Sequence, residues 1–104
     1  MIDLHTHTLF SDGVLIPSEL VYRAKYKGYK AIALTDHVDF SNMDFVIPGI
    51  VKVARILTDN YGISVFPGVE ITYVPPKLIK QAALECRKLG ASTKIGRASC
   101  RERV

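Results

Sequence analysis

The stretch Ile2-Asp3-Leu4-His5-Thr6-His7-Thr8-Leu9-Phe10-Ser11-Asp12-Gly13 begins this 104-residue chain and determines how the rest is interpreted. Its apolar start, Ile2 to Leu4, predicts a short strand. Alternate side chains of a strand share a face, so His5 and His7 point the same way and can bind one cation between them. Asp12, in a Ser-Asp-Gly turn, offers an oxygen ligand nearby, although this sequence is also typical of a plain turn. The stretch predicts a metal site or, in the simpler interpretation, two solvated loop histidines.

Helix signals recur three times after this stretch. The first helix is predicted to open at Ile16-Pro17-Ser18-Glu19, where Ser18 can cap it, the second after Pro48, and the third at Pro75-Pro76. Each helix has an apolar face at helical spacing and ends at a glycine, at positions 28, 62 and 90. Intervals of 34 and 28 residues between these glycines suit βα units, in which a helix joins two parallel strands.

Strand signals alternate with the helices. Residues 31–34 form a continuous apolar run of the kind buried in a parallel sheet, and residues 63–69 predict a third strand that bends at Pro67-Gly68. Residues 38–47 show no clean period and predict a long loop. A fourth strand is due near residue 91, but residues 91–97 contain no apolar run, so we predict no strand there. The pattern as a whole predicts an α/β fold of three βα units.

Composition and charge restrict the class of protein. A hydrophobic fraction of 48% and a mean hydropathy of +0.15 are typical of a globular chain, not a disordered one. The absence of a long apolar run and of a basic leader predicts a cytoplasmic protein without a membrane span. Residues 94–104 carry +3 of the net charge of +4, and residues 1–93 only +1. The charge therefore does not support a nucleic-acid partner, although it leaves one open. Cys86 is predicted to be a small core residue.

Ligand-type side chains stand where each predicted strand ends. His5 and His7 follow the first strand, Asp36 and His37 the second, and Glu70 the third. Because active sites of α/β proteins form at the carboxyl edge of parallel strands, we expect a metal site there, with three unconnected structural histidines as the alternative. A glutamate at a strand end is usually a surface residue, but this strand is buried in character, so Glu70 is predicted to bridge two cations. The role of Asp36 is open between a metal ligand, a helix cap and a hydrogen-bond partner that orients an imidazole ligand, and we favour the last.

Three motifs in this order resemble the polymerase and histidinol phosphatase (PHP) superfamily. They are Asp3-Leu4-His5-Thr6-His7 with Ser11-Asp12-Gly13, then Leu34-Thr35-Asp36-His37, then Gly68-Val69-Glu70-Ile71, and the resemblance covers about residues 2 to 92. It implies a distorted TIM-like (βα)7 barrel, of which this chain would supply the first three units. It also implies a cluster of up to three divalent metal ions, commonly zinc, manganese or iron.

The resemblance also implies roles for the site residues. His5 and His7 would bind one metal ion and Glu70 would bridge it to a second, whereas Asp12 and His37 would belong to a third site. Asp36 has no assigned role as a ligand by this resemblance. Two cations held close together can clamp a phosphate and stabilise charge on the attacking and leaving oxygens. The implied function is a metal-dependent phosphoesterase, a phosphomonoesterase of the histidinol phosphatase type that acts on a small phosphorylated substrate.

The chain departs from the family at its C-terminal end. Members need later histidines and a final Asp-x-His, but no histidine follows His37. Residues 94–104, Lys-Ile-Gly-Arg-Ala-Ser-Cys-Arg-Glu-Arg-Val, resemble the translation of a sequencing-library adapter. We therefore expect residues 1–92 to be the N-terminal part of a PHP domain and residues 93–104 to be a non-native tail. The 104-residue chain itself is expected to be inactive.

Two other functions fit the same residues. A metal-dependent amidohydrolase can also open a barrel with His-x-His, but the second and third motifs fit the PHP superfamily better and a metal-bridging lysine at a strand end is absent. A non-catalytic PHP module of a larger protein, such as a DNA polymerase, is the alternative from another class. Residues 38–47 and those after Glu70 are expected to line the pocket. Phe40, Phe45 and Tyr73 are its candidate walls, or else ordinary core residues.

Overall fold

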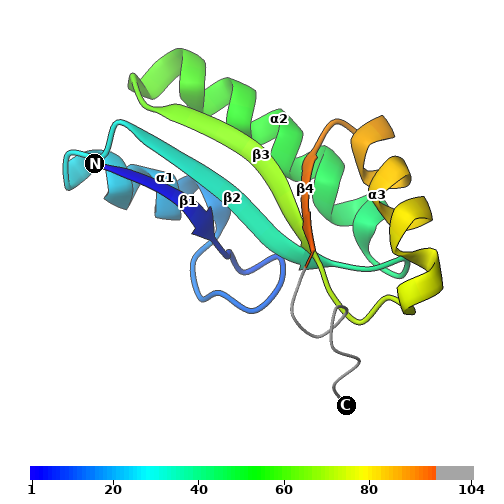
Figure 1. The fold of residues 1–104 in the computed structure, drawn as a ribbon. Coiled ribbons are helices and arrows are strands. Elements are labelled where there is room, and N and C mark those ends of the chain that lie inside the picture. The colour runs from blue at the N-terminus through cyan, green and yellow to red at the C-terminus, as the bar shows by residue number, and fades with distance from the viewer. Residues whose placement is uncertain (96–104) are drawn as a thin grey trace.

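A computed structural model describes residues 1–95, in which parallel strands alternate with helices. The elements are β1 (Ile2–Thr6), α1 (Pro17–Tyr26), β2 (Ala31–Val38), α2 (Met43–Tyr61), β3 (Ser64–Ile71), the 3-10 turn η1 (Pro76–Leu78), α3 (Ile79–Lys88) and β4 (Ser92–Ile95). All strand pairs are parallel, and the sheet order β1-β2-β3-β4 follows the sequence (Figure 1). The three predicted βα units are confirmed.

The two faces of the sheet differ in what covers them. One face carries large apolar side chains, among them Ile32, Leu34 and Ile71, each at most 1% exposed. Helices α1 and α2 pass behind the strands in Figure 1 and close this face. The opposite face carries Ala33 and its neighbour Phe66, whose side chain is half exposed. The hydrophobic core therefore lies between the sheet and the helices, and the other face is open in the described part of the chain.

The pairing of β1 with β2 is irregular. Asp3 pairs with Ile32 and Thr6 pairs with Leu34. The step along β1 is one residue longer than the step along β2, which is the definition of a β-bulge. The extra residue reverses the alternation of side chains beyond it, with consequences for the histidines of β1.

The pairing of β2 with β3 is regular. It runs without interruption from Ala31 and Ser64 to Val38 and Ile71, so the bend expected at Pro67-Gly68 does not break the ladder. Pairing of β3 with β4 begins only at Gly68. Pro67, which has no N–H to donate, therefore leaves no hydrogen bond to β4 unmade.

Helix α2 begins earlier than predicted. It starts at Met43, so the expected long loop over residues 38–47 and the helix start after Pro48 are both wrong. Pro48 lies inside the helix and cannot donate a backbone hydrogen bond there. Met43 and Ile47 are at most 3% exposed, and their burial in the core outweighs that loss. Similarly, Ser18 does not cap α1, because the helix begins one residue earlier at Pro17.

A fourth strand forms where none was predicted. Strand β4 pairs with β3 from Gly68–Ser92 to Ile71–Ile95. The prediction relied on an apolar run, whereas this short strand depends on backbone hydrogen bonds that almost any sequence can make. Residues 96–104 lie outside the described residues, so the expected non-native tail stays a prediction. None of the described helices has the length and apolar character to cross a membrane.

Candidate metal centre

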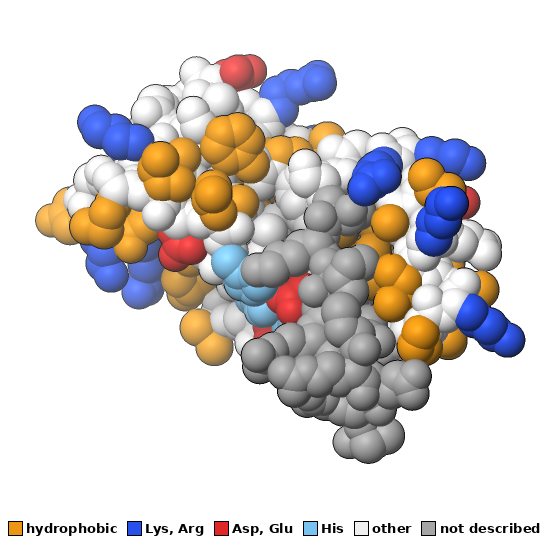
Figure 2. All heavy atoms as spheres, viewed as in Figure 1, with side chains coloured by type: hydrophobic (Ala, Val, Ile, Leu, Met, Phe, Trp, Pro, Cys, Tyr) orange, Lys and Arg blue, Asp and Glu red, His pale blue; other side chains and the backbone are white. Residues whose placement is uncertain are grey.

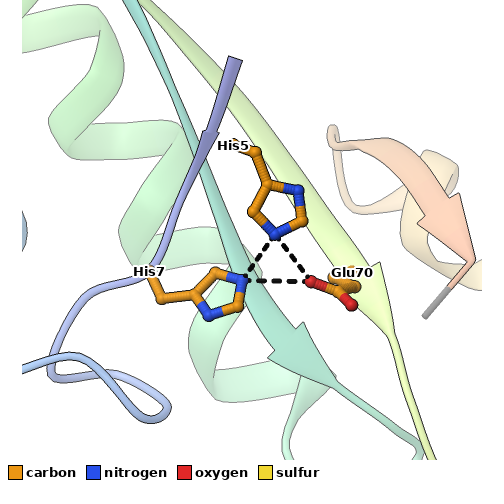
Figure 3. A group of neighbouring side chains, drawn as sticks. All are labelled: His5, His7 and Glu70. Atoms are coloured by element: carbon orange, nitrogen blue, oxygen red, sulfur yellow. Dashed lines mark hydrogen bonds and ion pairs between the residues drawn. The ribbon is translucent and has the colours of Figure 1, made fainter. Parts of the chain in front are cut away.

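Three ligand atoms meet at the carboxyl ends of β1 and β3. His5 Nε2 lies 3.0 Å from His7 Nε2, and Glu70 Oε1 lies 2.9 Å from the first and 3.0 Å from the second (Figure 3). The Glu70 side chain is 12% exposed, whereas His5 is 37% exposed, so the group is buried on one side and open on the other. Figure 2 shows histidine and acidic side chains together at the surface. We call these three residues the first ligand group.

The bulge in β1 explains how the first ligand group assembles. In a regular strand His5 would share the face of Asp3, which pairs with the core residue Ile32. The extra residue turns His5, and with it His7, to the face that carries Glu70. Bulges commonly re-aim side chains beside active sites in this way.

Hydrogen bonds alone cannot satisfy the first ligand group. With neutral imidazoles and an ionised carboxylate, at most two N–H protons serve the three contacts. If both nitrogens donate to Glu70 Oε1, no proton lies between the two nitrogens, which are 3.0 Å apart; if one imidazole donates to the other, no proton lies between either nitrogen and the Glu70 oxygen. A cation accepts electron pairs from all three atoms at once. The donor set therefore fits a bound metal ion.

A second ligand group consists of His7, Asp12 and His37. His7 Nδ1 lies 2.8 Å from Asp12 Oδ1, and His37 Nε2 lies 3.1 Å from Asp12 Oδ2. The other His37 nitrogen lies 2.9 Å from Thr72 Oγ1. His7 thus belongs to both groups, with Nε2 facing the first and Nδ1 facing the second.

Asp12 is the most exposed of the predicted ligands, with 61% of its side chain accessible. Burial is the largest single influence on its carboxyl and raises the pKa, but the hydrogen bond to His7 and the electrostatic attraction of His37 and His7 together outweigh it, so the pKa is lowered overall. When His7 Nε2 faces a metal ion, Nδ1 carries the proton and donates it to Asp12, an arrangement common around metal-bound imidazoles. Asp12 is therefore suited to orient His7 as well as to act as a ligand.

Asp36 holds the loop between β1 and α1 and does not contact an imidazole. Its fully buried carboxylate accepts hydrogen bonds from the Thr8 backbone N–H at 2.6 Å, the Thr8 hydroxyl at 2.8 Å and the Ser11 hydroxyl at 2.5 Å. Thr8 follows His7 and Ser11 precedes Asp12, so this carboxylate fixes the segment that connects the two ligand groups.

Sequence reasoning missed four residues that help to position the ligand groups. Thr8 and Ser11 bind Asp36, and Thr72 contacts His37. At Gly13 an added Cβ would lie 2.3 Å from the backbone oxygen of His7, so only glycine permits this turn. The Ser-Asp-Gly sequence pointed to a turn, but the hydroxyl contacts depend on pairing across the sheet and leave no pattern in the sequence.

A comparison with models of protein families identifies the family to which this chain belongs. The family model of the PHP domain matches residues 3–96. The chain belongs to the PHP family. The resemblance seen in the three motifs is thereby confirmed, and PHP domains are metal-dependent, in agreement with the two ligand groups.

Several curated proteins are similar to this PHP chain. An uncharacterized protein of Methanocaldococcus jannaschii is 48% identical over 90 residues, which cover 86% of this chain and 41% of that protein. A 5'-3' exoribonuclease of Haemophilus influenzae is 41% identical over 70 residues, covering 67% of this chain and 23% of the enzyme. The 5'-3' exoribonuclease Rnm of Escherichia coli is 36% identical over 72 residues, which cover 69% of this chain and 22% of that enzyme.

The chain therefore spans about two fifths of the archaeal relative and under a quarter of the two exoribonucleases. No solved structure gave a significant match.

Proposed function

We propose that this PHP chain is part of a metal-dependent phosphoester hydrolase. The observation that carries the proposal is the first ligand group, whose three ligand atoms lie 2.9–3.0 Å from one another, as expected of atoms that share one cation. His5, His7 and Glu70 would hold one metal ion, and Asp12 with His37 would serve another. A divalent ion in such a site polarises a phosphoryl oxygen and acidifies a bound water. Imidazole and carboxylate ligands suit zinc, manganese or iron.

The relatives favour RNA as the substrate. Two of them are named 5'-3' exoribonucleases, so we propose a phosphodiester of RNA, and a cytoplasmic enzyme. The small positive charge of residues 1–93 is no obstacle, because metal ions rather than basic side chains would bind the reacting phosphate. The histidinol phosphatase type expected from the sequence stays a prediction that these relatives do not support.

We further propose that the sheet continues into a TIM-like barrel in the complete protein. Strands β1 and β4 are the two edges of the described sheet, and all-parallel sheets almost always have both faces covered, whereas here one face of the described sheet is open. The chain also spans only 22–41% of its relatives. The missing strands would then cover the open face that carries Phe66.

The test combines metal binding with hydrolysis. Calorimetric titration with Zn²⁺ and Mn²⁺ is performed on the 104-residue chain, and hydrolysis is measured on the longest open reading frame that contains it. Substrates are a 5'-phosphorylated RNA oligomer, histidinol phosphate and p-nitrophenyl phosphate, each with and without a chelator.

We expect metal-dependent release of mononucleotides, abolished by His7→Ala. Hydrolysis of histidinol phosphate faster than that of RNA would instead support a phosphomonoesterase of the histidinol phosphatase type. Metal binding without hydrolysis of any substrate would support a non-catalytic PHP module. Turnover that survives both the chelator and His7→Ala would overturn the metal centre.

A further inference from the structure

Building on the hydrolase function above, we propose that a hollow beside the metal centre binds the nucleoside of the substrate, with its base stacked on Tyr73. The hollow has a volume of about 220 Å³. Its lining residues come from the end of β2 (His37 and Val38), the loop between β2 and α2 (Asp39, Ser41 and Asn42) and the segment after β3 (Thr72 and Tyr73). It is smaller than a typical pocket for a drug-sized ligand, about 300–1,000 Å³, so it suits one nucleoside.

Tyr73 is held in an unusual backbone conformation. Its φ of 58° is the only positive value among the described residues other than glycine. A bulky side chain in this left-handed region costs about 1–2 kcal/mol, so the surrounding structure must impose it. Thr72 and Val74 on either side are 7% and 2% exposed, and the Thr72 N–H donates to Val38 O at 3.1 Å. The anchored neighbours force Tyr73 outward.

The outward position exposes an aromatic ring at the hollow. The Tyr73 residue is 73% exposed although it lines a concave site. Burial of a tyrosine ring would normally stabilise the fold. The conformation of Tyr73 therefore costs stability twice, through its left-handed backbone and through its unburied ring. An exposed ring beside a phosphoester site is suited to stack on a nucleobase, an interaction that contributes about 1–3 kcal/mol.

The charges in the hollow orient the substrate. No lysine or arginine is found among the described residues that line it, whereas Asp39 contributes a carboxylate. The Ser41 N–H and hydroxyl donate to Asp39 Oδ1 at 2.8 and 2.5 Å and fix this carboxylate. A carboxylate repels phosphate but accepts hydrogen bonds from ribose hydroxyls.

His37 lines the hollow and also faces Asp12, so the two sites adjoin. The phosphate therefore lies at the metal centre, the ribose near Asp39 and the base on Tyr73.

The experiment compares two ligands that differ only in the base. Adenosine 5'-monophosphate and ribose 5-phosphate are titrated into the 104-residue chain in the presence of Zn²⁺, and the tyrosine ring signals are followed by NMR. We expect the nucleotide to bind about 5- to 150-fold more tightly and to shift the Tyr73 ring signals upfield.

Tyr73→Asn removes the ring but tolerates the left-handed backbone, and it should reduce the nucleotide affinity to that of ribose 5-phosphate. Tyr73→Phe should retain tight binding. Tyr26→Ala, at an equally exposed tyrosine at the end of α1, is the matched control and should change neither affinity.

Three results would overturn the proposal. Equal affinities of the two ligands for the unchanged chain would show that no base is recognised. An equal loss for both ligands in Tyr73→Asn would indicate a structural role only. Tighter binding of the phosphate ester of an amino alcohol, such as histidinol phosphate, than of the nucleotide would assign the hollow to another substrate class. Metal-dependent hydrolysis of p-nitrophenyl phosphate, which needs no nucleoside site, shows separately whether the hydrolase function stands.

Discussion

The two sides of the metal centre are built in different ways. His37 and Glu70 belong to β2 and β3, which pair without a break and are backed by the hydrophobic core. His5 and His7 belong to β1 and its loop, where the pairing is bulged and a few polar contacts fix the chain. The regular side depends on packing spread over many residues, the irregular side on single contacts. A single substitution on the β1 side should therefore be enough to disrupt the site, because no other contacts share its role.

The largest effect is expected from His7→Ala. His7 is the residue common to both ligand groups, so its loss should weaken Zn²⁺ binding by about 100-fold or more, beyond the usual effect of a residue that only orients a ligand. His5→Ala removes a residue of one group only and should have a smaller effect. Calorimetric titration measures both variants, with circular dichroism to check folding. Equal losses in the two variants would contradict the sharing of His7.

Gly13→Ala should be the most damaging change in the loop. The added Cβ would clash with the His7 backbone oxygen at 2.3 Å, and the backbone cannot move aside like a side chain, so we expect a loss of about 3 kcal/mol in the free energy of unfolding. Urea denaturation provides the measurement. Gly49→Ala in α2 is the control, because its added Cβ meets only the Phe10 ring, and its effect should stay within about 1 kcal/mol. If both variants lose the same amount, the loop is not tightly constrained.

Asp36→Asn tests the contact that joins the two sides. If the asparagine keeps its oxygen toward the Thr8 N–H and the Ser11 hydroxyl, its NH2 group faces the Thr8 hydroxyl, which now donates to the carboxylate and accepts from the Phe10 N–H. We expect a loss of about 2–3 kcal/mol in unfolding free energy and weaker metal binding, measured by urea denaturation and calorimetry. Asp59→Asn, at an exposed position of α2, should change stability by no more than about 0.5 kcal/mol. A stable Asp36→Asn with unchanged metal affinity would show that the loop is held by other contacts.

The regular side has a pH dependence of its own. Burial, with a smaller contribution from the charge of Glu85, raises the pKa of the Cys86 thiol from 9.0 to about 11. The raised pKa means that the contribution of the neutral thiol to stability is complete below pH 9 and is lost as the pH rises through 11. At pH 10.5 the loss should be about 2 kcal/mol.

The measurement for Cys86 is a difference between two chains. Urea denaturation at pH 8 and pH 10.5 is compared between the unchanged chain and Cys86→Ala, which removes the thiol but leaves the tyrosines and lysines that also titrate at high pH. The alanine variant should lose about 2 kcal/mol less than the unchanged chain over this interval. Identical losses would mean that the thiolate is accommodated in the folded chain.

The sequence indicated which residues lie together better than the way in which they are held. His5, His7, His37 and Glu70 could be expected to meet because ligand-type residues at strand ends form a pattern that repeats along the chain, and their roles as metal ligands stay predictions. The loop contacts of Asp36 were not, since they join positions 25–28 residues apart and leave no local signal.

The errors in the fold have the same cause. The start of α2 at Met43 is determined by burial in the core, against the signal from Pro48. Strand β4 is determined by its neighbour β3 rather than by its own residues. The sequence therefore predicted the features that depend on residue type, and it failed where contacts between distant segments outweigh local preference.

The bulge in β1 means that this strand can differ by one residue in length and keep the metal centre. Deletion of Leu4 would remove the bulge, so His5 would stand opposite Ala33 while Thr6 still paired with Leu34. Both histidines would then keep the face that carries Glu70. Among relatives of this chain, a one-residue gap between Asp3 and His5 would therefore mark a straighter strand rather than a lost metal centre.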